Sequence, residues 1–304
     1  TKKGAKGTPR VAYNGSVSVK HNYNTMDMMN AEEFKNHILT VAPDIADKSN
    51  ALFGTADTDW QKEIYRLGIA TDHNVSITGS AAQEKLPYRA SIGYVYDGGT
   101  IKKSDNQRIT ADVSLAPKFL KDHLSVNFNA KGIYNRANYV DGGVVGSAVY
   151  FDPTQSPYNY NADGTVNTDL TWDLDNPVYE ATLGSFSRSA THTLSNSSDL
   201  RWDISKMFLV TGHFNVSSDM GSRDIFTSPK SLLYKNETDL SKKGQYTKGM
   251  SNGISYNGNV VGTFNKFFDD ESLVSLSTGW EINHSKSNSE TIQAIGFFND
   301  HLSY

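Results

Sequence analysis

The sequence lacks cysteine altogether, and none of its 304 residues belongs to an apolar run of about 18 residues. The first absence excludes a disulfide framework and Cys-ligated metal sites, and it leaves the cellular compartment open. The second excludes an ordinary transmembrane helix. An excess of charge is lacking too, because 29 basic and 33 acidic residues leave a net charge of -4, which gives no indication of nucleic acid binding. A membrane-crossing strand escapes such a hydropathy scan, since half of its residues face a polar lumen.

The sequence is rich in alternation of apolar and polar residues. Within 108–135, Ile109, Ala111 and Val113 alternate with polar residues, and the pattern resumes at Leu124. A period of two residues is typical of a strand with one apolar and one polar face. The same test predicts nine strands: 10–22, 73–81, 87–97, two within 108–135, 191–204, 207–218, 248–266 and 272–286.

The connections between these strands alternate between long and short. Long links are expected near 23–72, 98–107, 138–190 and 219–247, each followed by a short one. A soluble sandwich has no reason to sort its loops in this way, whereas outer-membrane barrels have short periplasmic turns and long extracellular loops. The odd-numbered strands are then predicted to run outward. Strands of about 9–19 residues are also long for a globular protein and sufficient for a tilted membrane crossing.

These patterns predict an all-β fold, an antiparallel transmembrane β-barrel whose apolar faces contact lipid and whose polar faces line a wet interior. Lipid-exposed strands must pair every backbone group, so the sheet has to close. Nine is an odd number, whereas single-chain bacterial barrels normally have an even strand count, which favours part of a larger barrel. The alternative is a soluble all-β extracellular binding or adhesion module.

Local signals add detail to the long links. Asn30 followed by Glu33 resembles a capping box at the start of a helix within 26–43, and Asp59 is the expected N-cap of a second short helix. The glycine-rich segment 142–146 is expected to be a flexible loop with no helix after it, so a phosphate cradle is disfavoured.

Catalytic patterns are missing from the sequence. The eight histidines show no metal-ligand spacing, and there is no dinucleotide-binding or P-loop motif. We therefore predict no enzyme activity, no cofactor and no metal. A glycan-processing enzyme stays as a third possibility, and it would need two carboxylates about 5–10 Å apart.

The link 138–190 is the best candidate for substrate contact, because its aromatic residues are interleaved with Asp and Asn. Sugar rings stack on aromatic faces and hydrogen-bond to amides and carboxylates, and peptides use similar aromatics. Alternatively, these aromatics pack a small core of the loop or form an interfacial girdle. The candidate residues are Tyr139, Tyr150, Tyr158, Tyr160, Trp172 and Tyr179.

Several phrases in sequence order resemble one known family. They are TKKG at 1–4, VAYNG at 11–15, MNAEEF at 29–34, TDWQKEIYR at 58–66, HNVSITGS at 73–80, YRASIGYVYDGGTIKKSDNQRITADVSLAPKF at 88–119, NPVYEA at 176–181 and IGFFNDHLSY at 295–304. Together they are similar to SusC-like TonB-dependent transporters, the outer-membrane importers of glycans or peptides in Bacteroidetes. The similarity covers nearly the whole chain.

The resemblance implies a domain plan and partners. Residues 1–9 would be the end of a plug domain and its junction, and residues 10–304 the first part of a barrel of about 22 strands. Both ends of the sequence look cut from something longer. The implied location is the cell outer membrane, in contact with its lipid. The implied partners are a SusD-like surface lipoprotein, TonB acting through the missing N-terminal region, and an oligosaccharide or peptide substrate.

Overall fold

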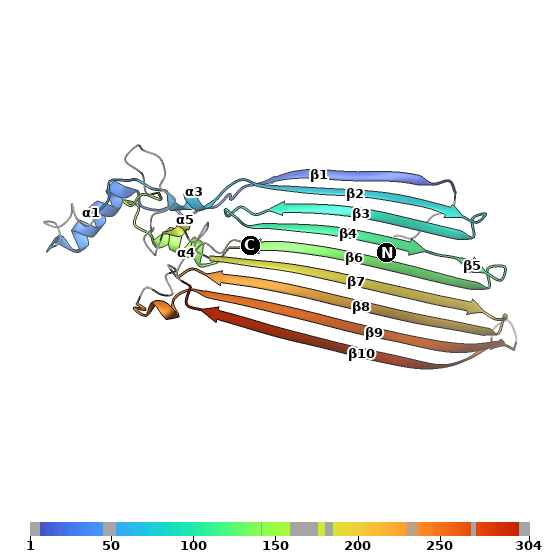
Figure 1. Cartoon of the computed structure of the whole chain (residues 1–304). Helices are drawn as coiled ribbons and strands as arrows, with labels where there is room; N and C mark the ends of the chain where they lie inside the picture. The colour runs from blue at the N-terminus through green and yellow to red at the C-terminus, as the bar shows by residue number, and fades with distance from the viewer. Residues whose placement is uncertain are drawn as a thin grey trace.

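The computed structural model describes residues 7–44, 53–140, 142–158, 176–179, 185–229, 231, 234, 236–268 and 272–297. It is a single antiparallel sheet in the order β1-β2-β3-β4-β6-β7-β8-β9-β10, with the short strand β5 paired to β6 (Figure 1). The strands are β1 (Arg10–Lys20), β2 (Gly68–Ala81), β3 (Leu86–Gly98), β4 (Asp105–Leu115), β5 (Lys118–Phe119), β6 (Leu124–Tyr139), β7 (Ser185–Asp203), β8 (Phe208–Thr227), β9 (Gln245–Phe267) and β10 (Leu273–Ile295).

The nine long strands correspond one to one with the predicted strands, but several are longer. β8 continues to Thr227 and β10 to Ile295, well beyond the predicted ends at 218 and 286. Much of the added length is polar, as in 287–289 of β10, so the alternation that identifies a strand fades there. Backbone pairing continues nevertheless, because Ser289 still faces Ser251 of β9.

The long links lie at one end of the sheet and the short links at the other, with one exception. The links 21–67, 140–184 and 228–244 all lie at one end, here called the loop end, and the links 82–85, 204–207 and 268–272 lie at the opposite turn end. The expected long link near 98–107 is wrong, since only 99–104 separates β3 from β4, fewer residues than 116–123 at the turn end. The Gly99 N–H donates a backbone hydrogen bond to the Ser104 carbonyl at 2.9 Å, which closes this link tightly, whereas the link at the turn end contains β5.

The helices gather at the loop end (Figure 1). They are α1 (Ala31–Val41), α3 (Trp60–Ile64), α4 (Gly143–Tyr150), α5 (Pro177–Tyr179) and the 3₁₀ helix η4 (Leu240–Lys242). None of the described helices is both long and apolar enough to pass through a membrane.

The sheet has an apolar face and a polar face, and both follow from the register. One row on the polar face is Ala12, Ser76, Ser91, Asp112, Lys131, Ser195, Ser217, Ser255 and Ser285. The neighbouring row on the apolar face begins with Tyr13, Val75, Ile92 and Ala111. In a strand, successive side chains point to opposite sides, which keeps the two sets apart over the whole sheet.

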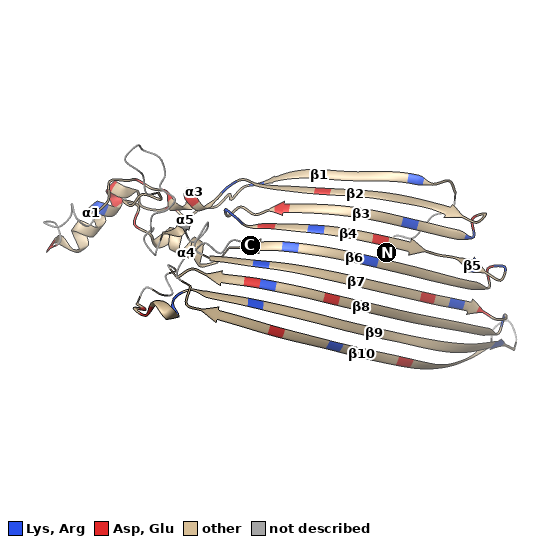
Figure 2. Ribbon diagram, viewed as in Figure 1, with Lys and Arg blue, Asp and Glu red and all other residues tan. Residues whose placement is uncertain are grey.

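The apolar face is exposed rather than covered. Ile92 is 59% exposed, Phe214 47% and Val113 41%, although each lies within a long strand. Among the described residues the sheet is one layer, and the helices extend beyond its end instead of packing over this face (Figure 1). Charged residues of both signs are sparse along the strands (Figure 2). A contiguous apolar surface of this size requires a partner phase, either another protein layer or lipid.

Candidate functional site

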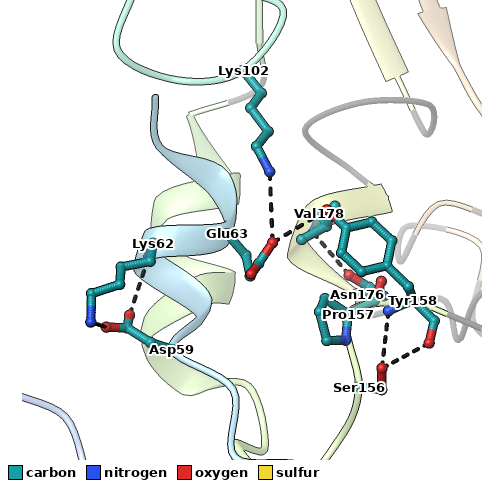
Figure 3. Close-up of polar contacts among 9 residues, drawn as sticks. All are labelled: Asp59, Lys62, Glu63, Lys102, Ser156, Pro157, Tyr158, Asn176 and Val178. Atoms are coloured by element: carbon teal, nitrogen blue, oxygen red, sulfur yellow. Dashed lines mark hydrogen bonds and ion pairs between the residues drawn. The ribbon is translucent and has the colours of Figure 1, made fainter. Parts of the chain in front are cut away.

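The helix α3 organises the loop end, and its start follows the prediction. The Asp59 side chain accepts a hydrogen bond from the Lys62 backbone N–H at 3.1 Å, and Lys62 Nζ lies 2.9 Å from Asp59 Oδ2 (Figure 3). Burial works to raise the pKa of Asp59, but the side-chain and backbone hydrogen bonds from Lys62 outweigh it and the pKa falls below its ordinary value. The carboxylate is therefore the favoured form in the folded cap.

Replacing Asp59 by alanine is expected to destabilise α3 by about 1 kcal/mol, because one helix N–H loses its acceptor. Since folding lowers the pKa of Asp59, its ionised form stabilises the cap above the pKa of the unfolded chain, and this contribution is lost as the pH falls through the folded pKa. Hydrogen-exchange protection of the α3 amides at pH 6 and pH 3 measures both effects. Asp59→Asn keeps an acceptor and should lose only the pH dependence; an unchanged pH dependence would contradict this assignment.

A small hydrophobic core joins the first and third links of the loop end, 21–67 and 140–184. Trp60 and Ile64 of α3 pack with Val144 and Ala148 of α4 and with Val178 of α5, all of them buried. The Trp60 indole Nε1 donates a hydrogen bond to the Asp152 carbonyl at 2.9 Å. We call these five buried residues the loop-end core.

The structure of the glycine-rich segment 142–146 differs from the predicted one. Gly142 is the N-cap residue and α4 begins at Gly143, so the expectation of a loop without a helix is wrong. Glycine disfavours a helix, but burial of Val144 and Ala148 in the loop-end core offsets that local preference. This compensation depends on residues about 80 positions earlier in the chain, so a local sequence window does not contain it.

The short link 99–104 braces the same assembly. Lys102 N–H donates to the Ile64 carbonyl at 3.0 Å, and Arg66 N–H donates to the Thr100 carbonyl at 2.7 Å. The Lys102 ammonium also lies 3.7 Å from a Glu63 carboxylate oxygen (Figure 3). Three links from different parts of the chain are therefore fixed to one another at the loop end.

The entry to α1 is held against α3. Asn30 and Glu33 form the predicted capping box, which is confirmed, and the Asp57 carboxylate accepts a hydrogen bond from the Ala31 N–H at 2.8 Å. The Gln61 amide hydrogen-bonds both the N–H and the carbonyl of Met26, at 2.9 and 2.7 Å. Segment 25–30 thus crosses α3 in a defined conformation.

A groove of about 830 Å³ lies between this segment and the helices α1, α3 and α4. Its apolar walls include Met28, Met29 and Phe34, and its polar groups include His37 and the carboxylates of Asp27, Asp57 and Asp59. Apolar walls with a few polar groups are typical of sites for organic ligands. Within the described residues, no group of three or more His, Asp or Glu side chains is placed to hold a metal ion.

The predicted substrate residues fall in different places. Tyr150 is 89% exposed and lines the groove. Tyr139 lies on the polar face at the loop end, and the Arg223 guanidinium carbon is 6.0 Å from the centroid of the Tyr139 ring. Arg223 Nε donates a hydrogen bond to Ser187 Oγ at 3.2 Å.

Tyr158 packs against the loop-end core, and its hydroxyl donates to a Glu63 carboxylate oxygen at 3.2 Å (Figure 3). That arrangement favours the alternative considered for these aromatics, in which they pack a core of the loop. Tyr160 and Trp172 lie outside the described residues, as does the side chain of Tyr179 at the end of α5.

Sequence reasoning missed several residues of this region. Met28, Met29 and Trp60 are not among the residues that the sequence indicates for substrate contact, but all three line the groove. Arg223 gave no local signal, because only the pairing of β7 with β8 places it beside Ser187 and Tyr139.

No family model matches the sequence. The TonB-dependent receptor SusC of Bacteroides thetaiotaomicron is 40% identical over 190 residues, which is 60% of this chain and 18% of that receptor. The TonB-dependent receptor P3 of Formosa agariphila is 30% identical over 197 residues, again 60% of this chain and 18% of the relative. The chain therefore spans less than a fifth of these relatives.

Solved structures have the same fold. The RagAB peptide transporter superposes with a TM-score of 0.74 at 16% identity, covering all of this chain and 38% of the other. The RagAB peptide importer in its closed-closed state gives 0.74 at 15% identity, with the same coverage. Both names describe transporters, and both sequence relatives are named receptors, so none is named as an enzyme. Over 190 of its residues the chain is a homologue of the TonB-dependent receptor SusC, and it has the fold of part of an outer-membrane β-barrel of that type.

Proposed function

We propose that this chain is the first part of the barrel of an importer that takes up an oligomeric nutrient, a glycan or a peptide, in a TonB-dependent manner. The observation that carries the proposal is the division of one sheet into an exposed apolar face and a Ser- and Asn-rich polar face. Such a sheet separates lipid from a wet lumen. In this role the residues position and select cargo, and none of them is catalytic.

The two edges of the sheet support a larger barrel. β1 and β10 each pair on one side only among the described strands, and β10 is 23 residues long. Unpaired N–H and C=O groups in hydrocarbon cost several kcal/mol each, so both edges need further strands. We infer that residues 10–304 supply the beginning of a barrel of about 22 strands, entered from a plug domain through residues 1–9.

The partners follow from the same reasoning. The loop end carries the braced links, and long links of outer-membrane barrels face the outside. A SusD-like surface lipoprotein would meet the barrel there, and TonB would act through a plug from the turn end. The outer-membrane lipid contacts the apolar face.

Substrate contacts are proposed at two places. Tyr150 lines the groove between α1, α3 and α4, and Tyr139 with Arg223 lies on the lumen side of the loop end. An exposed aromatic ring offers an apolar face to a sugar ring or a peptide side chain, and Arg223 offers donors to a carboxylate. Glycan and peptide cargo both fit this chemistry.

Binding of oligosaccharide and peptide mixtures by the intact protein in detergent tests the proposal. One of the two mixtures is expected to bind, and Tyr150→Ala or Tyr139→Ala should weaken that binding about tenfold, the equivalent of about 1.4 kcal/mol of lost stacking. Tyr23→Ala is the matched control, since Tyr23 is 92% exposed and lies outside the groove. Absence of binding from both mixtures, or an equal loss in the Tyr23 variant, would overturn the proposal.

A further inference from the structure

Two arginines lie on the apolar face just beyond the apolar belt, toward the loop end. Arg136 of β6 follows Tyr134 on the same face, and Arg188 of β7 precedes His192 by four residues on that face. Register pairs Arg136 with Ala190 and Arg188 with Asn138, so the two arginines are diagonal neighbours on adjacent strands. Diagonal neighbours have Cβ atoms roughly 7–8 Å apart, which suits two guanidinium groups that hold one anion.

Both guanidinium groups are available to a ligand. Arg136 and Arg188 are exposed, and neither forms an ion pair with a described residue. The Arg188 guanidinium carbon lies 4.5 Å above the Phe186 ring centroid, which holds it against the sheet without using its hydrogen-bond donors.

The carboxylates of Asp224 and Asp105 lie in the same row as Arg188. Asp224 faces Arg188 in the register. It accepts from the Tyr246 hydroxyl at 2.6 Å and lies 4.0 Å from Lys248 Nζ. Asp105 Oδ2 accepts from the Asn138 amide at 2.9 Å, and its Oδ1 is buried without a hydrogen-bond partner among the described residues. Lys248 adds a third cation in this row, so the patch has three cations against two carboxylates, which favours an anion.

The surface below the arginines is aromatic and apolar, as is expected for contact with hydrocarbon chains. The Tyr134 and His192 rings lie 4.7 Å apart directly beneath them, where an aromatic girdle marks the membrane interface. Below the girdle is a depression of about 470 Å³ over the small residues Ala111, Ala130 and Gly132, with Val113 and Leu194 as walls. An acyl chain would fill this depression.

We propose that this face binds a phosphorylated glycolipid of the outer leaflet, with a phosphate between Arg136 and Arg188 and an acyl chain in the depression. Arginine pairs bind phosphate oxygens through several N–H donors, and guanidinium is weakly hydrated at an interface. The loop end faces outward, so the lipid at this height belongs to the outer leaflet. The proposal goes beyond cargo import and does not depend on which nutrient is carried.

Native mass spectrometry of the intact protein in detergent, titrated with lipid A that carries its phosphates, tests the site. The double variant Arg136→Gln, Arg188→Gln is expected to bind this lipid at least about tenfold more weakly, because two charge-assisted contacts are lost. Arg108→Gln is the matched control, since Arg108 is an exposed arginine of the neighbouring strand β4 on the polar face and does not line the depression, and lipid binding by this variant should be unchanged. Equal binding by the double variant and the wild type would overturn the proposal.

Three further measurements distinguish a phosphorylated lipid from free phosphate. Dephosphorylated lipid A should bind as weakly as lipid A binds to the double variant, and inorganic phosphate should not compete at equal concentration. Gly132→Phe fills the depression, where an added Cβ would be 3.5 Å from Leu194 Cδ2, and should weaken lipid A binding. Full competition by inorganic phosphate, or unaltered binding by Gly132→Phe, would mean a phosphate site without a lipid and would overturn the proposal.

Discussion

Replacing Val113 by arginine is expected to lower the free energy of unfolding in a bilayer by about 2–4 kcal/mol, the cost of a cation at the hydrocarbon midplane on the lipid face of a barrel. Val113 is 41% exposed and lies in the middle of the apolar face, between rows that contain Ile92 and Phe128. The residues directly opposite in the register, Ala90 and Ala130, offer no hydrogen-bond partner to an introduced guanidinium group. Urea unfolding in vesicles measures the difference.

Thr110→Arg on the same strand is the matched control, because Thr110 lies on the polar face opposite Gly93. Its expected effect is about 0.5 kcal/mol or less, as for substitutions on a wet surface. Equal losses in the two variants would show that the apolar face is not in contact with lipid. A stable, monodisperse Val113→Arg protein in buffer without detergent would have the same consequence, since a soluble module would tolerate an exposed arginine.

Replacing Trp60 by alanine is expected to cost about 3–5 kcal/mol at the loop end, since a large side chain leaves a packed core. Trp60 is 3% exposed, its ring centroid lies 4.7 Å from that of Phe151, and its indole N–H bonds the Asp152 carbonyl. It therefore connects the first link of the loop end to the third. We expect α3 and α4 to lose hydrogen-exchange protection together, while the strands keep theirs.

Trp60→Phe separates packing from hydrogen bonding in this core. It keeps an aromatic ring against Phe151 and loses the bond to Asp152, so a smaller loss of about 1 kcal/mol is expected. Loss of protection in α3 alone, with α4 unchanged, would show that the two links fold independently. Global unfolding of the sheet would contradict the separation of the loop end from the strands.

Much of the fold could be predicted because the strand period acts locally. Ile109, Ala111 and Val113 identify β4 without knowledge of its neighbours, and the caps Asn30 and Asp59 identify their helices in the same way. The prediction of secondary structure failed where packing or strand pairing outweighed the local preference of the residues. Helix α4 begins in a glycine-rich segment, and β8 and β10 continue past the last alternating residue.

The candidate site was less predictable than the fold. The aromatic composition of the link indicated Tyr150 and Tyr158 equally. In the structure Tyr150 is 89% exposed beside the groove, whereas Tyr158 packs on the loop-end core. Nothing in the sequence around either residue distinguishes them. The difference arises from α3, which lies about 90 residues earlier in the chain and contacts the third link through Trp60 and Ile64.

The local order of residues accounts for the two faces of the strands, because side chains alternate along any extended backbone whatever its neighbours are. It also accounts for the helix starts at Asn30 and Asp59, where capping depends on residues only three positions apart. The assembled sheet is needed to bring the links together at the loop end and to make two arginines neighbours on the apolar face. Those contacts join residues far apart in the chain, and strand register and packing bring them together only when the whole sheet has formed.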